Sequence, residues 1–170
     1  MLGAWKRLRQ LRRDRKTAKL QREAAAAVVE PGLGKLGETL AGRHLEKGGL
    51  RILARNVQTP CGEIDIVAMD GKGPTAAVVF VEVKTRRKGG RRGTPEEAVT
   101  RDKADRLARA ATAFLARSRN LQSKPCRFDV VAIEVPRGAT AAEVTAKPAL
   151  ATVRWHRAAF DVSPRALRGC

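Results

Sequence analysis

Aromatic side chains are scarce in this sequence of 170 residues: they make up 4% of it, and tyrosine is absent. Proteins that read single strands by stacking bases on aromatic rings need more of them, so this class is disfavoured. No run of about 18 apolar residues is present, which argues against a membrane span. Residues 1–15 also lack the apolar stretch of a secretory signal, so we expect a cytoplasmic protein.

The usual signatures of several enzyme classes are missing as well. Three cysteines without C-x-x-C spacing and two histidines predict neither a zinc knuckle nor a Ser-His-Asp triad. The Gly-x-x-x-x-Gly-Lys phosphate loop of NTPases is absent. Acidic residues are in deficit, because 17 Asp and Glu face 35 Lys and Arg, a formal net charge of +18. Such a surface favours a polyanionic partner, meaning DNA, RNA or an anionic membrane.

The charge is unevenly organised along the chain. Residues 1–30 hold nine basic and three acidic side chains, and we predict a basic N-terminal extension that is disordered or helical. Leucines and a tryptophan recur there at every third position, so an arm that binds nucleic acid or a membrane surface is the alternative to a solvated tail. Residues 31–170 are predicted to form one domain, which is large enough to bury its own core.

Hydrophobic periodicity predicts the elements of this domain. A helix is expected over residues 33–47, and a second one from the Thr94-Pro95 cap to about residue 117. Strands are expected over residues 51–57, 62–69, 76–85, 127–135 and 150–156. The order predicts an α/β fold with a central mixed β-sheet flanked by helices.

Acidic residues gather on the second and third predicted strands. Strand alternation places Glu63 with Asp65 on one face, and Glu82 with Lys84 on one face of the next strand. If these strands form a hairpin about the turn at residues 72–74, positions whose numbers sum to 147 lie opposite each other. Asp65 would then oppose Glu82. Two carboxylates that close predict a shared proton or a bound cation, and Mg²⁺ or Mn²⁺ suits such oxygen ligands.

The same register pairs Glu63 with Lys84, so a cross-strand salt bridge is the structural alternative to a metal site. In the metal interpretation, Lys84 supplies a positive charge one step from the cation. Glu38 lies at the edge of the first helix's apolar stripe, and either turns toward the sheet or is an ordinary surface acid. Lys103 falls within the apolar stripe of the second helix, where it must snorkel, pair with an acid or reach a phosphate.

A cationic loop follows the third strand. Between Arg86 and Gly93, five residues are cations and the other three are glycines, a composition that can follow a phosphate backbone. A merely solubilising loop is the alternative. The nucleic-acid contacts that we predict are Arg86, Arg87, Lys88, Arg91, Arg92 and Lys103.

Several motifs occur in an order that resembles one known family, the YraN family of predicted endonucleases. They are Gly37-Glu38-x-x-Ala41, Ile52-Leu53-Ala54-Arg55-Asn56, Gly62-Glu63-Ile64-Asp65-Ile66-Val67-Ala68, Val79-Phe80-Val81-Glu82-Val83-Lys84-Thr85-Arg86, Gly93-x-Pro95-x-x-Ala98-Val99, Lys103 and Arg127-Phe128-Asp129-Val130-Val131. The resemblance covers about residues 33–160 and implies a PD-(D/E)XK nuclease-like fold, similar to that of Holliday-junction resolvases.

The resemblance also implies roles for individual residues. Asp65, Glu82 and the carbonyl of Val83 would bind the metal, and Lys84 would position the attacking water. Glu38 matches the acid of the first helix, and Lys103 matches a polar position of the following helix. The sequence departs from the family pattern by having Ile64 where the superfamily motif is named for a proline.

These observations predict a metal-dependent DNA endonuclease that uses Mg²⁺ or Mn²⁺ and acts on branched or structured DNA. RNA stays open as a further ligand. A junction-resolving enzyme would need two sites and hence a homodimer. The alternative is a non-catalytic basic protein that binds DNA or RNA and retains a vestigial nuclease site.

Overall fold

The computed structural model describes residues 32–89 and 101–162, and within these ranges it contains one five-stranded β-sheet. The strands are β1 (Arg51–Thr59), β2 (Gly62–Asp70), β3 (Ala77–Arg87), β4 (Cys126–Val135) and β5 (Thr152–His156). The helices are α2 (Leu33–Lys47), α3 (Arg101–Ala116) and the short α4 (Ala141–Ala146), with 3₁₀ turns η2 (Arg119–Leu121) and η3 (Pro148–Leu150). No helix of the described ranges is long and apolar enough to cross a membrane.

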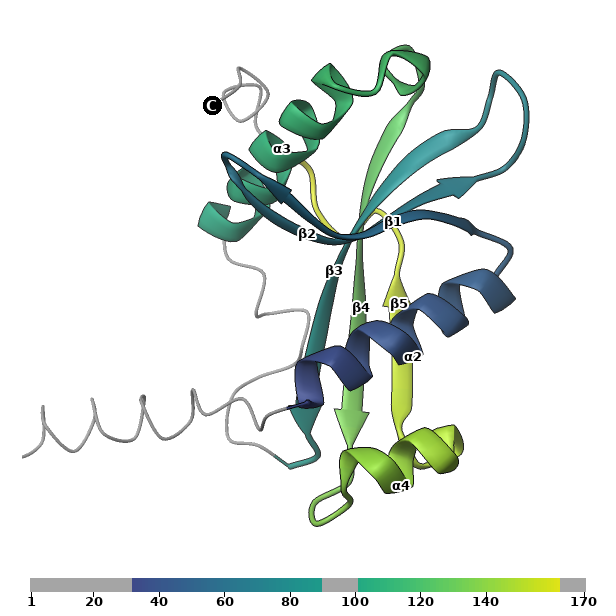
Figure 1. Ribbon diagram of the computed structural model, residues 1–170, viewed down its shortest axis with the longest axis vertical. Helices are drawn as coiled ribbons and strands as arrows, with labels where there is room; N and C mark the ends of the chain where they lie inside the picture. Colours follow the sequence, from purple (N-terminus) through teal and green to yellow (C-terminus); the bar gives the residue numbers. More distant parts are fainter. Residues whose placement is uncertain (1–31, 90–100, 163–170) are drawn as a thin grey trace, which may run out of the picture. The chain divides into compact units, whose positions relative to one another are not determined.

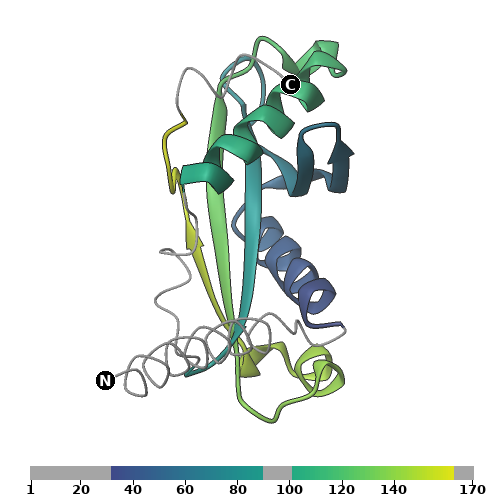
Figure 2. The same cartoon turned by 90° about the vertical axis from the view of Figure 1, so that its left-hand side faces the viewer.

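The sheet is mixed. Its spatial order follows the sequence, β1-β2-β3-β4-β5, and only the β3–β4 pair is parallel. A parallel pair needs a crossover connection, and α3 lies in the segment that joins β3 to β4 (Figure 1). Figure 2 shows β3, β4 and β5 side by side. The predicted α/β class with a central mixed sheet flanked by helices is therefore confirmed, and the arrangement is consistent with a PD-(D/E)XK nuclease-like fold.

Two hydrophobic clusters cover the two faces of the sheet. On one face, Leu36, Leu40 and Leu45 of α2 pack in a cluster with Val79 and Val81 of β3. On the other face, α3 packs against the intervening positions of β3. That second cluster includes Leu107, Ala108 and Ala111 of α3 together with Val78 and Phe80 of β3. Because β3 is buried on both faces, its apolar residues run continuously instead of alternating with polar ones.

The β2–β3 hairpin has the register that the sequence predicted, but it is shorter than expected. Its pairs run from Asp70↔Ala77 to Ile66↔Val81, and the numbers of each pair sum to 147. The pairing ends there. Glu63 pairs with Gln58 of β1, and neither Glu63 nor Asp65 pairs with β3, so the predicted backbone pairs with Glu82 and Lys84 do not form. A gap between β2 and β3 therefore opens at Asp65.

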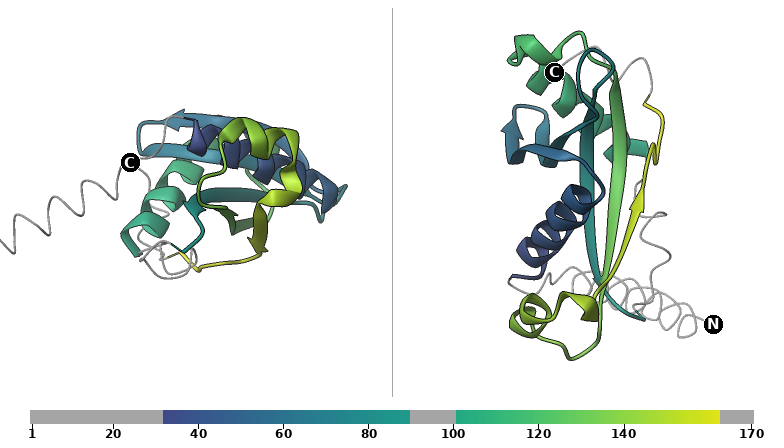
Figure 3. Two further views of the ribbon diagram at one scale, coloured as in Figure 1. Left: turned by 90° about the horizontal axis from the view of Figure 1, so that it is seen from below. Right: turned by 90° about the vertical axis from the view of Figure 1, so that its right-hand side faces the viewer.

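Most predicted elements agree with the structure, and one was missed. Helix α2 has the predicted bounds, and β3 runs two residues further than expected. The missed element is α4, which begins with a capping box between Thr140 and Glu143 and packs beside α2 at the end of β4 (Figure 3). Residues 1–30, the Thr94-Pro95 cap, Arg91 and Arg92 lie outside the described residues, so their predictions stay untested.

Candidate functional site

The gap between β2 and β3 is bridged by a side chain instead of a backbone group. The N–H of Val83 donates a hydrogen bond to Oδ2 of Asp65, with a distance of 2.6 Å between nitrogen and oxygen. The N–H and C=O of one strand residue point toward the same neighbouring strand. The carbonyl of Val83 therefore also faces the gap, on the same edge of β3 as Asp65.

Glu82 and Lys84 flank Val83 on β3, and both point to the opposite face from it. Oε1 of Glu82 accepts a hydrogen bond and ion pair from Nζ of Lys84. Each of the two side chains is about 20% exposed, so the pair is mostly shielded but reachable from solvent. The salt bridge of Lys84 thus forms along its own strand, and the predicted cross-strand partner Glu63 is exposed instead.

Asp65 is the acid whose ionisation the surroundings perturb most clearly. Burial and the negative charge of Glu82 raise its pKa from 3.8 to about 6. The hydrogen bond from Val83 and the positive charge of Lys84 lower the pKa, and Glu38 raises it slightly. Glu82, Lys84 and Glu38 therefore all lie close enough to act on the ionisation of Asp65.

Helix α2 brings Glu38 to this site through an unusually close approach to β3. A Cβ at Gly37 would collide with the side chain of Thr85, which follows Lys84 on β3. The glycine thus lets the helix backbone lie directly on the strand, although glycine inside a helix costs about 0.5–1 kcal/mol relative to alanine. The neighbouring residue of α2 is Glu38, so the same contact sets its distance from the acids of the sheet.

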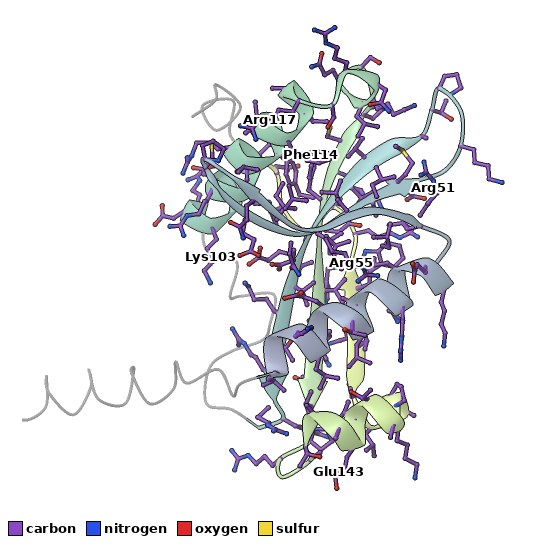
Figure 4. The ribbon with its side chains drawn as sticks, viewed as in Figure 1. Arg51, Arg55, Lys103, Phe114, Arg117 and Glu143 are labelled. Atoms are coloured by element: carbon purple, nitrogen blue, oxygen red, sulfur yellow. The ribbon has the colours of Figure 1, made fainter. Side chains whose placement is uncertain are left out.

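A second contact ties α2 to β1. Nη1 of Arg55 donates to the backbone carbonyl of Glu38 at 3.2 Å, and its guanidinium lies where a Cβ of Gly42 would be. Figure 4 shows Arg55 between β1 and α2. Sequence reasoning did not single out Arg55 as a site residue. The signal was present in the glycines of α2, whose spacing of five residues marks two places of close approach.

Lys103 lies near the site but not where its helical position predicted. It is exposed at the start of α3, whereas Ala104, Leu107 and Ala108 form the buried stripe. The positive charge of Lys84 is the main cause of its lowered pKa, and Glu82 acts in the opposite direction. Lys103 therefore flanks the buried stripe and adds a cation beside the Glu82–Lys84 pair.

The start of the cationic loop is anchored to the turn that follows β4. Arg87 donates to the carbonyls of Pro136 and Ala139, and Arg137 donates to those of Lys88 and Gly89, the latter at 2.7 Å. The guanidinium of Arg87 is thus engaged with protein. Arg86 and the exposed Lys88 continue the basic surface from Lys84, and their nucleic-acid contacts stay predictions.

The donor set at the gap fits a small divalent cation whose coordination is completed by other ligands. The carboxylate of Asp65 lies at the gap, Glu82 is close enough to raise its pKa, and the carbonyl of Val83 faces the same gap. No cluster of three or more His, Cys, Asp or Glu side chains suited to a metal occurs in residues 32–89 and 101–162. Mg²⁺ in proteins is usually held by one or two carboxylates together with water and substrate phosphates. Burial and repulsion by Glu82 raise the pKa of Asp65, and such a cation would offset both effects.

A second polar cluster, which sequence reasoning missed, is centred on Asp129 of β4, which pairs with Val81 of β3. Asp129 is fully buried. Its carboxylate accepts hydrogen bonds from Arg127 at 2.8 and 3.0 Å, Trp155 at 2.9 Å and the N–H of Ala158 at 2.9 Å. Arg127 also pairs with Asp70 at 2.8 Å. With all its donors satisfied, this cluster is a structural brace between β4, β5 and the residues after β5.

Comparison with known proteins identifies similar sequences. The sequence model of "Uncharacterised protein family UPF0102" matches residues 37–133, a range that contains Glu38, Asp65, Glu82, Lys84 and Lys103. A UPF0102 protein of Symbiobacterium thermophilum is 53% identical over 102 residues, which cover 60% of this chain and 81% of that protein. A UPF0102 protein of Chlorobaculum tepidum is 48% identical over 59% of this chain and 74% of its own length.

The similarity extends further in another relative. A UPF0102 protein of Nitrosococcus oceani is 39% identical over 129 residues, which cover 76% of this chain and 91% of that protein. These matches confirm the family resemblance that the ordered motifs predicted.

Proposed function

This chain belongs to the UPF0102 family, and we propose that it is a metal-dependent endonuclease that hydrolyses phosphodiester bonds in DNA. We further propose branched or otherwise structured DNA as the substrate. Resolution of a junction would require two such sites and therefore a homodimer.

The observation that carries the proposal is the gap at Asp65. Ending the β2–β3 pairing at Ile66↔Val81 costs backbone hydrogen bonds, and it places a half-buried carboxylate beside Glu82. A protein that only binds polyanions gains nothing from acids gathered within a basic surface, because they repel phosphates. If these acids bind a cation, and that cation contacts the phosphate, their presence within a basic surface is explained.

The residues of the site have distinct tasks in this proposal. Asp65 and Glu82 would hold Mg²⁺ or Mn²⁺, with the carbonyl of Val83 on the same edge. When bound, the cation supplies Lewis-acid stabilisation of the phosphate and a water of lowered pKa. Lys84 orients the carboxylate of Glu82 through their ion pair and places a positive charge beside the phosphate. In the reaction, a water oxygen forms a bond to phosphorus, the P–O bond to the leaving strand breaks, and the leaving oxygen takes up a proton.

Electrostatics support nucleic acid as the class of substrate. The chain carries a net charge of +18, and cations adjoin the acids on both β3 and α3. Neutralising backbone phosphates with Lys and Arg is the main source of DNA affinity. The proposed cleavage site thus lies within the surface that would attract its substrate.

Incubation of the purified chain with linear, nicked and branched DNA tests the proposal, in Mg²⁺, in Mn²⁺ and in a chelator. We expect cleavage in either metal, none in the chelator, and a preference for branched substrates. Asp65→Asn should be inactive. Glu63→Gln is the matched control, since it neutralises an exposed carboxylate two residues earlier on the same strand, and it should cleave like the wild type.

Two outcomes would contradict the proposal. Equal cleavage by the wild type and Asp65→Asn would show that the carboxylate of Asp65 is not needed for the reaction. DNA binding by the wild type without cleavage of any substrate in either metal would favour the non-catalytic binding protein with a vestigial site.

A further inference from the structure

The first turns of α3 carry two exposed cations beside the proposed cleavage site. Lys103 and Arg106 are three residues apart, so they project from adjoining positions on one side of the helix. The core-facing positions between and beyond them, Ala104, Leu107 and Ala108, are buried. Figure 4 shows Lys103 at one end of α3 and Arg117 toward the other. The charge of Glu82 acts on Lys103, so this end of α3 lies near the acids.

The stem of Arg106 has a fixed support. Its Cγ and Cδ lie 3.3 and 3.4 Å from where a Cβ of Gly62 would be. Gly62 has a φ of +135°, which side chains rarely adopt, and it begins the strand that carries Asp65 three residues later. The methylenes of Arg106 thus lie over the start of β2, and the residue as a whole is exposed.

The charge of this pair is not neutralised by the protein. Lys84, Arg86 and Arg106 all act on Lys103 with the same sign, and Glu82 is the one acid among its main electrostatic neighbours. Within the described part of the chain, neither Lys103 nor Arg106 forms an ion pair with a carboxylate, although Asp102 lies one turn before Arg106. Cations held together without a carboxylate in ion-pair contact favour an anionic ligand.

We propose that Arg106, together with Lys103, forms a second phosphate-binding site for the DNA backbone, distinct from the cationic loop that follows β3. Arg106 presents a planar fork of N–H donors that suits a phosphate group, and its packing on Gly62 holds the fork beside the strand of Asp65. The backbone would then be held on α3 as well as at the end of β3, with the acids between the two. The inference rests on the proposed function only in taking DNA as the anion.

Binding in a chelator tests this site without any requirement for cleavage. The fluorescence anisotropy of a short fluorescein-labelled DNA duplex would be measured with wild type, Arg106→Ala, Lys103→Ala and Arg51→Ala, between about 50 and 200 mM salt. Arg51 is the matched control, because it is an exposed arginine at the start of β1, far from Lys103 in Figure 4. Its replacement by alanine removes the same net charge, so any difference in DNA affinity between the variants is due to the position of the lost charge.

We expect Arg106→Ala and Lys103→Ala each to weaken binding about five- to tenfold and to lower the slope of log affinity against log salt by about one. Arg51→Ala should change affinity less than twofold and leave the slope unchanged. Arg106→Lys keeps the charge and should retain the slope, whereas Arg106→Met keeps only the apolar stem and should lower the slope like Arg106→Ala. Equal affinity and slope for Arg106→Ala and Arg51→Ala would overturn the proposal. Loss of binding in Arg106→Ala without cleavage by the wild type would retain this site and reject the nuclease.

Discussion

The carboxylate of Asp65 takes the place of a strand carbonyl opposite the N–H of Val83, 2.6 Å from its nitrogen. The contact satisfies a donor that the shortened β2–β3 pairing would otherwise leave without a partner, and it fixes one carboxylate oxygen at the edge of β3. The other carboxylate oxygen does not take part in this hydrogen bond and is available to the proposed cation. The side chain of Asp65 thus satisfies a backbone N–H of β3 and also provides a proposed metal ligand.

Asp65→Asn should stabilise the metal-free protein at alkaline pH. The folded-state pKa of Asp65 is raised from 3.8 to about 6, so folding favours its protonated form. That stabilisation is complete below about pH 4 and is lost as the pH rises through 6. Asparagine can still accept from Val83 but carries no charge. We expect it to be more stable than wild type by up to about 3 kcal/mol at pH 8, and equally stable at pH 4.

Urea denaturation in a chelator at several pH values measures this difference. Glu63→Gln, which changes an exposed carboxylate on the same strand, should show no comparable dependence on pH. A constant difference between wild type and Asp65→Asn across the range would mean that Asp65 ionises normally.

Mg²⁺ should stabilise the protein more at pH 8 than at pH 5. A cation needs the ionised carboxylate, and protons compete for Asp65 below its pKa of about 6. The rise in Tm with added Mg²⁺ should therefore fall steeply between these pH values in the wild type and be absent in Asp65→Asn. An equal rise in both proteins would place the bound cation elsewhere.

Lys84→Ala should lose cleavage while retaining the fold and the stabilisation by Mg²⁺. Its ammonium group contacts Glu82 and adds positive charge beside the proposed phosphate, and loss of one such electrostatic group costs about 10²-fold or more in rate. Lys84→Arg keeps the charge but is planar and wider, so partial activity is expected. The measurement is the cleavage rate of the wild type and of both variants as a function of pH. A wild-type rate in Lys84→Ala would make Lys84 a structural counter-ion of Glu82.

Gly37→Ala and Gly34→Ala form a matched pair on α2. Alanine at 37 would collide with Thr85, and we expect a loss of about 1–3 kcal/mol as the helix shifts from β3. Alanine at 34 meets nothing within 4 Å, so its better helix propensity should stabilise by about 0.5–1 kcal/mol. Both are read from thermal or urea unfolding. Stabilisation by both alanines would show that α2 does not depend on its contact with Thr85.

Asp129→Ala should be among the most destabilising single changes to the folded unit. It leaves the partly buried donors of Arg127 and Trp155 without their acceptor and empties a fully buried position, at a cost of about 3 kcal/mol. Glu134→Ala is a suitable comparison, because its pair with Arg154 is half-exposed and worth less than about 1 kcal/mol. At a temperature where Asp129→Ala remains folded, its DNA affinity should match the wild type. A loss below 1 kcal/mol would mean that the brace is dispensable.

The acidic centre was predictable because it depends on local rules. Strand alternation and one hairpin turn place Asp65 and Glu82 on adjoining strands in the register that the structure has. The point at which the pairing ends was not predictable, since it depends on competition between β1 and β3 for β2. Lys103 was predicted to lie within the apolar stripe of α3, but it is exposed. An ideal helical wheel does not reveal where the buried stripe of a helix is centred. The Asp129 cluster joins residues of distant segments, which no local pattern records.

Helix α4 shows the opposite case, a missed element whose signal was present. Thr140 and Glu143 have the spacing of a capping box, and both of its hydrogen bonds form. With six residues, the helix is too short to display a hydrophobic period, and a period was the evidence used for the longer helices.

The connectivity of the sheet has a consequence for the order in which the protein folds. Strands β1, β2 and β3 follow one another as hairpins, so their contacts close short loops, whereas the parallel β3–β4 pair must wait for the long segment containing α3. Asp65 and Glu82 both belong to the early hairpins. We therefore expect pulse-labelled hydrogen exchange during refolding to protect Val79 and Val81 before Val131. The two acids would then be neighbours while the α3 side of the site is still unformed, so the late crossover is the step that adds its cations.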